Sequence, residues 1–455
     1  MPEALRCVSV VGAGAAGTLT AAQLLRRAAA LRLDLAVRLI DPAAAAGRGV
    51  AYTTSAAHHL LNVPACGMSA FPDRPDHFVR WLARRSPGAH TGGDYVPRAL
   101  YGEYLADVLA RAARSGPGRL HRIHERVVGV RRTDRGVTLA LESGGPLPAE
   151  AVVLALGNFP PTEAWVPPTL RRSPRYLADP WAPGALAGLS PDGDVLLVGT
   201  GLTMVDVALT LSRAGLAVRA ISRHGLVPQP HAESPLPAVP APHFAPGADL
   251  QQVRRTVLSH VSACRREYGD WRVGIDGLRP VTAELWQRLS LTDRARFLRH
   301  DHGLWNVHRH RVPPASARAL RDGIGAGRIL VTPGEVADAV PSEDFVLVRL
   351  RDGRTLRVGA VVNCTGPQAD VRRLDDPLVA DLLATGLAVP DPTGVGFHTS
   401  PCGRLHPPAG APPAPLWTLG PPRRGALLES TAIPEIRAQA RALAATLLNT
   451  PHDAG

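Results

Sequence analysis

The chain has 455 residues, of which 45% are hydrophobic and 20% are charged, as is ordinary for a soluble globular protein. This length predicts two or three domains, and the apolar content excludes a mainly disordered chain. No apolar run approaches the ~18–20 residues that a membrane span needs. All 51 basic residues are Arg, which excludes Schiff-base chemistry on Lys and a phosphate-binding loop of the Walker type.

The net charge of +12 raises the question of a nucleic-acid partner. The Arg residues are spread along the chain, however, and form neither a basic tract nor a recognition motif. Abundant Gly, Pro and Arg are instead typical of a GC-rich genome. We therefore expect neither a nucleic-acid nor a membrane partner.

The five cysteines have no spacing that suits a redox-active disulfide or a Cys-rich zinc site, and we expect no metal. Their count is odd, and the chain begins directly with an apolar strand rather than a secretion signal. We therefore expect a cytoplasmic protein. The cysteines are Cys7, Cys66, Cys264, Cys364 and Cys402.

The first 41 residues follow the order of a dinucleotide-binding unit. A β-branched apolar strand at Cys7–Val11 runs into the glycine motif GAGAAG at 12–17. An Ala- and Leu-rich helix at 18–30 follows, and then a second apolar strand at 35–40 that ends at Asp41. The glycine motif alone is weak evidence, but the complete order predicts dinucleotide binding.

Each part of this unit has a physical reason. Gly12 allows a tight turn, Gly14 lets the backbone approach a pyrophosphate, and Gly17 lets helix and strand pack closely. The start of the helix offers free N–H groups to the phosphates, and Asp41 accepts hydrogen bonds from ribose hydroxyls. The predicted contacts are Gly12, Gly14, Ala15, Ala16, Gly17 and Asp41.

A second unit of the same kind begins near residue 194. A strand at 194–198 runs into Gly-Thr-Gly, a helix follows, and the next strand at 217–221 ends in Ser222 and Arg223. A carboxylate there would repel a 2′-phosphate, whereas a hydroxyl and a guanidinium bind it. The second site is therefore predicted to bind NADP(H), although an Arg after a strand is also often simply solvated. The predicted contacts are Gly199, Gly201, Leu202, Thr203, Ser222 and Arg223.

Both units return through β-rich stretches to an apolar strand and a glycine, Gly157 in the first and Gly366 in the second. The chain thus predicts an α/β fold of two Rossmann-like dinucleotide-binding domains with a helical insertion. We expect the first part of the FAD-binding domain at 1–188 and the NADPH-binding domain at 189–365. The insertion falls at about 228–314, and residues 366–455 return to the first domain.

The motifs GAGAAG and GTGLTM resemble those of flavoproteins with two dinucleotide-binding domains. The segments GRGVAYTT (47–54), HLLNVPA (59–65), MSAFPD (68–73) and WNVHRHR (305–311) resemble more closely a bacterial family of FAD/NAD(P)-binding, monooxygenase-like flavoproteins. Proteins similar to it include L-aspartate N-monooxygenases and an FAD-dependent urate hydroxylase. The resemblance implies FAD at the first motif, NADPH at the second and molecular oxygen as co-substrate.

Further site residues come from these segments. The glycines of 47–52 would let this loop follow the flavin, with Gly49 close to it and Arg48 on the pyrophosphate; the alternative is a surface loop. The amide of Asn62 can both donate to and accept from the flavin ring, so Asn62 is a catalytic candidate; the alternative is a turn-capping residue.

The polar cluster at 300–311 is a third candidate. H-x-H occurs in it, but no carboxylate-rich or Cys partner for a metal site sits nearby. One interpretation is a solvated basic loop. The other is that Arg309 or Arg311 binds an anionic substrate or the NADP phosphates through two parallel hydrogen bonds.

Taken together, these patterns predict an FAD- and NADPH-dependent monooxygenase of a small polar substrate, with the amine nitrogen of an amino acid such as L-aspartate as the target. A disulfide reductase is disfavoured because no cysteine pair is present. A urate-type heterocycle hydroxylase and an NAD(P)H-dependent flavin dehydrogenase remain alternatives. A nucleotide-binding redox sensor is the non-enzymatic alternative.

Overall fold

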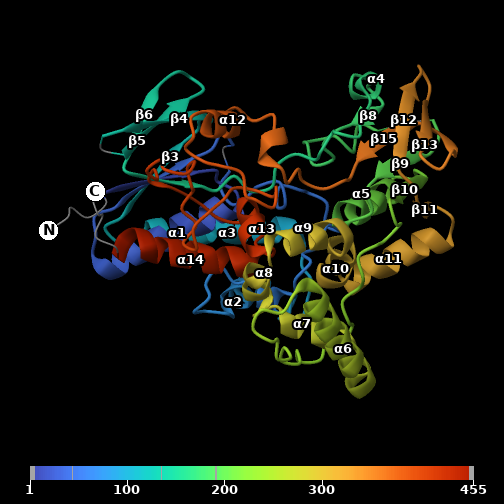
Figure 1. Ribbon diagram of the computed structural model, residues 1–455, viewed down its shortest axis with the longest axis horizontal. Coiled ribbons are helices and arrows are strands. Elements are labelled where there is room, and N and C mark those ends of the chain that lie inside the picture. Colours follow the sequence, from blue (N-terminus) through green and yellow to red (C-terminus); the bar gives the residue numbers. More distant parts are fainter. Residues whose placement is uncertain (1–5, 44, 135, 190–191, 450–455) are drawn as a thin grey trace.

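The computed structural model describes residues 6–43, 45–134, 136–189 and 192–449. Two sheet-centred domains lie side by side, and a group of helices projects below their junction (Figure 1). None of the described helices is long and apolar enough to cross a membrane.

The first sheet has the order β16-β7-β1-β2-β3, and all of its strands are parallel. Val10 of the central strand pairs with Leu39 on one side and with Val153 on the other. Parallel sheets are covered on both faces, which explains why the central strands are mainly apolar, with Ser9 in β1 and Arg38 in β2 as the polar residues among β1, β2 and β7. The strands are β1 (Cys7–Val11), β2 (Ala36–Ile40), β3 (Arg119–Ile123), β7 (Ala151–Leu154) and β16 (Leu416–Thr418).

Helices cover one face of this sheet, where α1 packs against both α3 and α14. These are α1 (Ala15–Leu31), α2 (His77–Arg85), α3 (Arg98–Ala113) and α14 (Ile433–Asn449). An antiparallel three-stranded sheet and α12 cover the other face. They comprise β4 (Val127–Thr133), β5 (Gly136–Leu141), β6 (Pro146–Ala149) and α12 (Pro377–Ala384).

The second sheet repeats this plan with the order β8-β15-β9-β10-β11, again all parallel. Its strands are β8 (Tyr176–Leu177), β9 (Val195–Val198), β10 (Val218–Ser222), β11 (Ile329–Pro333) and β15 (Ala360–Asn363). One face carries α5 (Leu202–Arg213) and α11 (Pro314–Gly325). The other carries α4 (Pro168–Arg171), β12 (Val336–Pro341), β13 (Val346–Leu350) and β14 (Thr355–Val358). The predicted pair of Rossmann-like domains is confirmed.

The projecting group consists of five helices between β10 and α11. Its longest helix begins at Asp249, which forms a reciprocal capping box with Gln252, and ends at Gly269 in the left-handed conformation. The helices are α6 (Leu250–Tyr268), α7 (Arg272–Leu278), α8 (Thr282–Arg288), α9 (Leu291–His300) and α10 (His302–Arg309). Short turns elsewhere are η1 (Ala65–Gly67), η2 (Val371–Arg373), η3 (Pro421–Arg423) and α13 (Arg424–Leu427).

The chain passes between the domains earlier than expected. Both α4 and β8 precede the boundary placed at 188/189, yet β8 pairs with β15 and α4 packs on β12 of the second domain. A strand of two residues leaves no periodic pattern in the sequence, which explains the difference. Near the other end, β16 completes the first sheet and α14 packs on α1.

Candidate functional site

The first glycine motif makes a turn that admits no side chain at two positions. Gly12 has a φ of +100°, and a Cβ atom there would overlap the carbonyl oxygen of Ala155. A Cβ atom on Gly17 would overlap the carbonyl oxygen of Gly12. These two glycines therefore hold the start of α1 against β1 and β7.

A second glycine loop closes over the first. A Cβ atom on Gly14 would lie 3.5 Å from Cα of Gly49, so the two backbones run almost in contact. Because Gly14 caps α1 without a side-chain hydrogen bond, the N–H groups of Ala15 and Ala16 have no side-chain acceptor and are available to an anion. This arrangement is a cradle for a pyrophosphate.

Asp41 lies at the carboxyl end of β2 and anchors this cradle. Its Oδ2 accepts the N–H of Ala13 at 2.6 Å, and its Oδ1 accepts the N–H of Ala43 at 2.8 Å. The carboxylate thereby stays at the edge of the cleft, where the remaining lone pairs of its oxygens can accept from ribose hydroxyls.

These residues line a cleft of about 920 Å³, which has the size of a cofactor site. The uncapped helix, the glycine contact and the acidic residue fit the pyrophosphate and ribose of FAD. The predicted residues that line the cleft are Gly12, Gly14, Ala15, Ala16, Asp41, Arg48, Gly49 and Gly157. Gly17 does not line it and instead packs behind the turn.

A second cleft, of about 850 Å³, lies at the carboxyl ends of β9 and β10. Gly199 has a φ of +109°, and Gly201 caps α5 without a side-chain hydrogen bond. The hydroxyls of Ser222 and Thr200 lie 2.7 Å apart, while Arg223 is exposed at the rim. All seven residues expected here line the cleft, namely Gly199, Gly201, Leu202, Thr203, Ser222, Arg223 and Gly366.

The two clefts meet. Asn158, which follows β7, and Thr431, which precedes α14, line both of them. Ligands that enter from opposite ends would therefore converge between these two residues. Sequence reasoning missed both, since neither lies in a glycine motif.

Comparisons with known proteins agree with this geometry. A family model described as FAD-NAD(P)-binding matches residues 9–159, whereas no curated protein sequence matches the chain. The ornithine hydroxylase PvdA from Pseudomonas aeruginosa has a TM-score of 0.65 and 16% identity, covering 98% of this chain and 99% of its own. The FAD-bound cadaverine monooxygenase DfoA from Erwinia amylovora has a TM-score of 0.66 and 12% identity, with coverages of 98% and 95%. The bacillithiol disulfide reductase Bdr from Staphylococcus aureus has a TM-score of 0.58 and 12% identity, with coverages of 98% and 99%.

Over residues 9–159 the chain is similar to FAD–NAD(P)-binding domains. The chain as a whole has the fold of two-domain flavoproteins, so the resemblance to N-hydroxylating monooxygenases is confirmed at the level of the fold. The expectation of a flavin-dependent oxidoreductase that uses FAD and NADPH agrees with these matches. At these identities the fold itself does not select the reaction, because a disulfide reductase shares it.

Three contacts fix the first domain against α5 of the second domain. Nη2 of Arg98 lies 2.8 Å from Oδ2 of Asp206, and both side chains are almost buried. Nε2 of His58 and Nε2 of His59 lie 2.8 and 2.9 Å from the hydroxyl of Thr210. Burial lowers the pKa of each histidine to about 4, so both rings are neutral near pH 7. The relative placement of the two clefts depends on these contacts.

Asn62 does not line either cleft. Its backbone carbonyl lies 2.9 Å from Nε2 of His231, a ring whose pKa burial and the nearby Arg311 lower to about 4. Since a carbonyl only accepts, this nitrogen carries the hydrogen. The expected contact between Asn62 and the flavin stays a prediction. The contact with His231 joins the first domain to the insertion.

The two arginines expected to bind an anionic substrate are already paired. Nη2 and Nε of Arg309 donate to Oε2 of Glu429 at 2.8 and 3.1 Å. Arg311, whose side chain is buried, pairs with the partly exposed Asp276. Neither arginine lines a cleft. This corrects the expectation for both, because a buried guanidinium needs its countercharge and leaving one charge unpaired is strongly destabilising.

The second cleft is lined instead by Arg424 and Glu429, which sequence reasoning missed. Nη2 of Arg424 lies 3.2 Å from Nε2 of His302, and the guanidinium has no carboxylate partner within the part of the chain described. Burial lowers the pKa of Arg424. Burial and the positive charge of Arg424 lower the pKa of His302 to about 4. Oε1 of Glu429 is buried and has no hydrogen-bond partner among the described residues. No motif surrounds either residue, so no local signal could have identified them.

Proposed function

We propose that this protein is an FAD- and NADPH-dependent monooxygenase that hydroxylates the amine nitrogen of a small molecule. The observation that carries the proposal is the meeting of the two clefts at Asn158 and Thr431. In the proposed reaction the amine, O₂, NADPH and a proton give the hydroxylamine, water and NADP⁺. Bound FAD supplies the redox chemistry by accepting the hydride of NADPH and delivering the electrons to oxygen.

The residues of the first cleft bind and orient the flavin nucleotide. The uncapped N–H groups of Ala15 and Ala16 meet the pyrophosphate, Arg48 adds a positive charge from the covering loop, and Asp41 takes the ribose. In the second cleft, Arg223 and the hydroxyl of Ser222 take the 2′-phosphate. This cation and hydroxyl in place of a carboxylate support NADPH over NADH.

The cysteines support oxygen rather than a disulfide as the electron acceptor. Cys364 lines the second cleft, and its burial raises the pKa of its thiol well above the usual value. No other cysteine lines either cleft in the described structure, and every cysteine in the described part of the chain is free. Transfer of electrons through a disulfide at the junction would need two neighbouring cysteines there, and only Cys364 lines a cleft in the described structure.

The charges of the second cleft support an amine as the group that reacts. The unpaired Oε1 of Glu429 is an acceptor that a substrate N–H would satisfy, since a buried carboxylate oxygen without a donor is costly. Arg424 offers a guanidinium to a carboxylate. An amino acid such as L-aspartate would use both residues, with Arg424 in the role first assigned to Arg309 and Arg311.

Spectroscopy and oxygen uptake test this function. The purified protein should carry FAD, and NADPH should bleach the flavin absorbance under anaerobic conditions. Added amine should then stimulate oxygen uptake with formation of hydroxylamine in step with NADPH oxidation. Bleaching without hydroxylamine from any amine would identify a dehydrogenase or oxidase, and a protein that binds NADPH without reducing the flavin would be a nucleotide sensor.

A further inference from the structure

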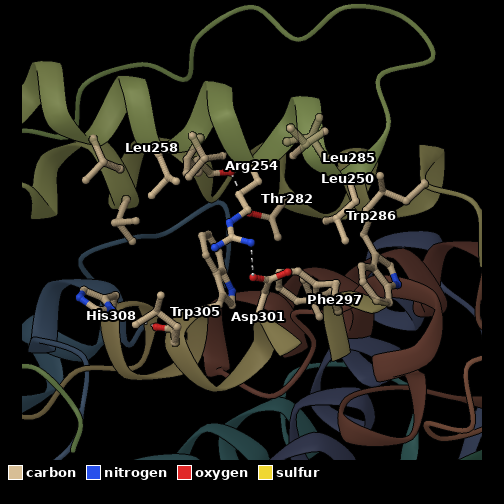
Figure 2. Close-up of a pocket in the computed structure, with 18 of the residues that line it drawn as sticks. Leu250, Arg254, Leu258, Thr282, Leu285, Trp286, Phe297, Asp301, Trp305 and His308 are labelled. Atoms are coloured by element: carbon tan, nitrogen blue, oxygen red, sulfur yellow. Dashed lines mark hydrogen bonds and ion pairs between the residues drawn. The ribbon is translucent and has the colours of Figure 1, made fainter. Parts of the chain in front are cut away.

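An apolar pocket of about 480 Å³ lies inside the helical insertion, beside the second nucleotide cleft. Side chains of α6 face those of α9 and α10 across it (Figure 2). Its walls include Val253, Val257, Val261, Leu285, Phe297 and Leu304. The volume falls within the roughly 300–1,000 Å³ of small-molecule sites, whose walls are also mainly apolar.

Few polar groups interrupt this lining. Arg254 of α6 reaches across to Asp301, which precedes α10, with 3.4 Å between Nη1 and Oδ1 (Figure 2). Because the side chain of Arg254 is 59% exposed, this ion pair belongs to the rim and adds little stability. Leu258 and Leu304 are about half exposed beside it. An open apolar surface of this kind usually marks a binding site.

The pocket shares a wall with the second nucleotide cleft. Trp305 and Leu428 line both spaces. The indole Nε1 of Trp305 is buried and lacks a hydrogen-bond partner in the described structure. The insertion pocket and the second cleft thus adjoin at these two side chains.

Leu428 has a strained backbone at this wall. Its φ of 59° and ψ of −56° place it in a γ-turn, which is closed by the N–H of Glu429 on the carbonyl of Leu427 at 2.7 Å. Non-glycine residues rarely adopt this conformation, and such strain concentrates at functional sites. The turn directs Leu428 toward the pocket, while Glu429 and Arg424 line the cleft on the other side.

We infer that the substrate is an amino acid with a large apolar side chain, which the insertion pocket holds while Arg424 and Glu429 take the carboxylate and the amine. This assignment rests on the proposed function and sharpens it. A small polar acid such as L-aspartate would leave the pocket empty and its apolar wall exposed to water. Its binding would then gain no free energy from burial of that apolar surface. The wall shared with the cleft favours a small molecule over a partner helix, since the occupant then adjoins the reacting groups.

A pocket-filling variant tests the assignment. Val257→Phe adds bulk inside the pocket, and Ser259→Phe places the same side chain on the exposed side of the same helix as a control. The FAD-loaded protein would be assayed with L-phenylalanine, L-leucine and L-aspartate for hydroxylamine and substrate-stimulated NADPH oxidation. We expect the two apolar amino acids to be preferred, and Val257→Phe to raise their KM about ten- to hundredfold. Basal NADPH oxidation and the KM should both be unchanged in Ser259→Phe, because Ser259 lies outside the pocket.

Other outcomes separate this assignment from its rivals. Preferential turnover of L-aspartate, with a KM that Val257→Phe leaves unchanged, would overturn the pocket but keep the monooxygenase. Failure of NADPH to reduce the flavin would overturn the proposed function itself. A dimer seen by light scattering that Val257→Phe dissociates, without any change in KM, would make the pocket an interface between two copies. Val261→Phe, one turn further along α6, repeats the test should Val257→Phe not fold.

Discussion

The two nucleotide-binding units share strand order, glycine turn and flanking three-stranded sheet, yet they treat their ligands differently. In the first unit the loop of Gly49 closes over Gly14, whereas a Cβ atom on Gly201, the counterpart of Gly14, would meet nothing within 4 Å. In the first cleft the loop of Gly49 therefore covers the glycine turn, whereas in the second cleft the glycine turn is open. This difference matches a cofactor that stays bound and a co-substrate that must leave after each turnover.

Substitution of the glycines should give the largest effect. Gly17→Ala puts a Cβ atom into the carbonyl oxygen of Gly12, so we expect the variant to misfold and to lose FAD. Gly201→Ala has open space and a φ of −80°, so its melting temperature should stay close to that of the parent. Flavin content and thermal unfolding measure both. Retention of stoichiometric FAD in Gly17→Ala would show that the first turn does not need a glycine at position 17.

Breaking the buried link between the units comes next. Arg98→Ala leaves Asp206 without its countercharge and should lower the free energy of unfolding by about 3–5 kcal/mol. The exposed pair of Arg80 and Asp76 is the matched control, and Arg80→Ala should cost less than about 1 kcal/mol. Denaturant titration gives both values. Equal small losses would mean that the link is no stronger than a surface ion pair.

The contrast between Asp41 and Ser222-Arg223 predicts nucleotide preference. Arg223→Ala removes a charge-assisted contact worth about 1.5–3 kcal/mol, so the KM for NADPH should rise by roughly one to two decades. Activity with NADH should change little, because NADH lacks the 2′-phosphate. Steady-state kinetics of the parent and the variant with NADPH and with NADH measures both effects. An equal loss with both would assign Arg223 a structural role.

The smallest effect concerns pH. Burial and the neighbouring Arg98 lower the pKa of His59 to about 4 in the folded protein, against about 6.5 when unfolded. The neutral ring of His59 thus contributes fully to the free energy of unfolding above pH 6.5, and this contribution is lost as the pH falls toward 4. Between pH 7 and 5 this loss is about 2 kcal/mol. His59→Gln should flatten the pH dependence of the melting temperature, whereas the exposed His224→Gln should leave it unchanged.

The fold was more predictable than the substrate site, for a physical reason. A glycine turn with its flanking strands and helix is local, so residues 7–41 show the first unit directly, and residues 194–223 the second. Charge pairing is not local. The sequence marks Arg309 as polar, but its partner Glu429 lies 120 residues away. Only the folded chain shows that Arg309 is neutralised and that Arg424, in no motif, faces the cleft.

The crossing of the chain between domains has a consequence for synthesis. All five strands of the second sheet, from β8 to β15, precede β16 and α14 in the chain. The second domain can therefore close on the ribosome while the first still lacks an edge strand and the helix that covers α1. The domain that emerges first is completed last, and until then it exposes the apolar face of α1 and one free edge of its sheet.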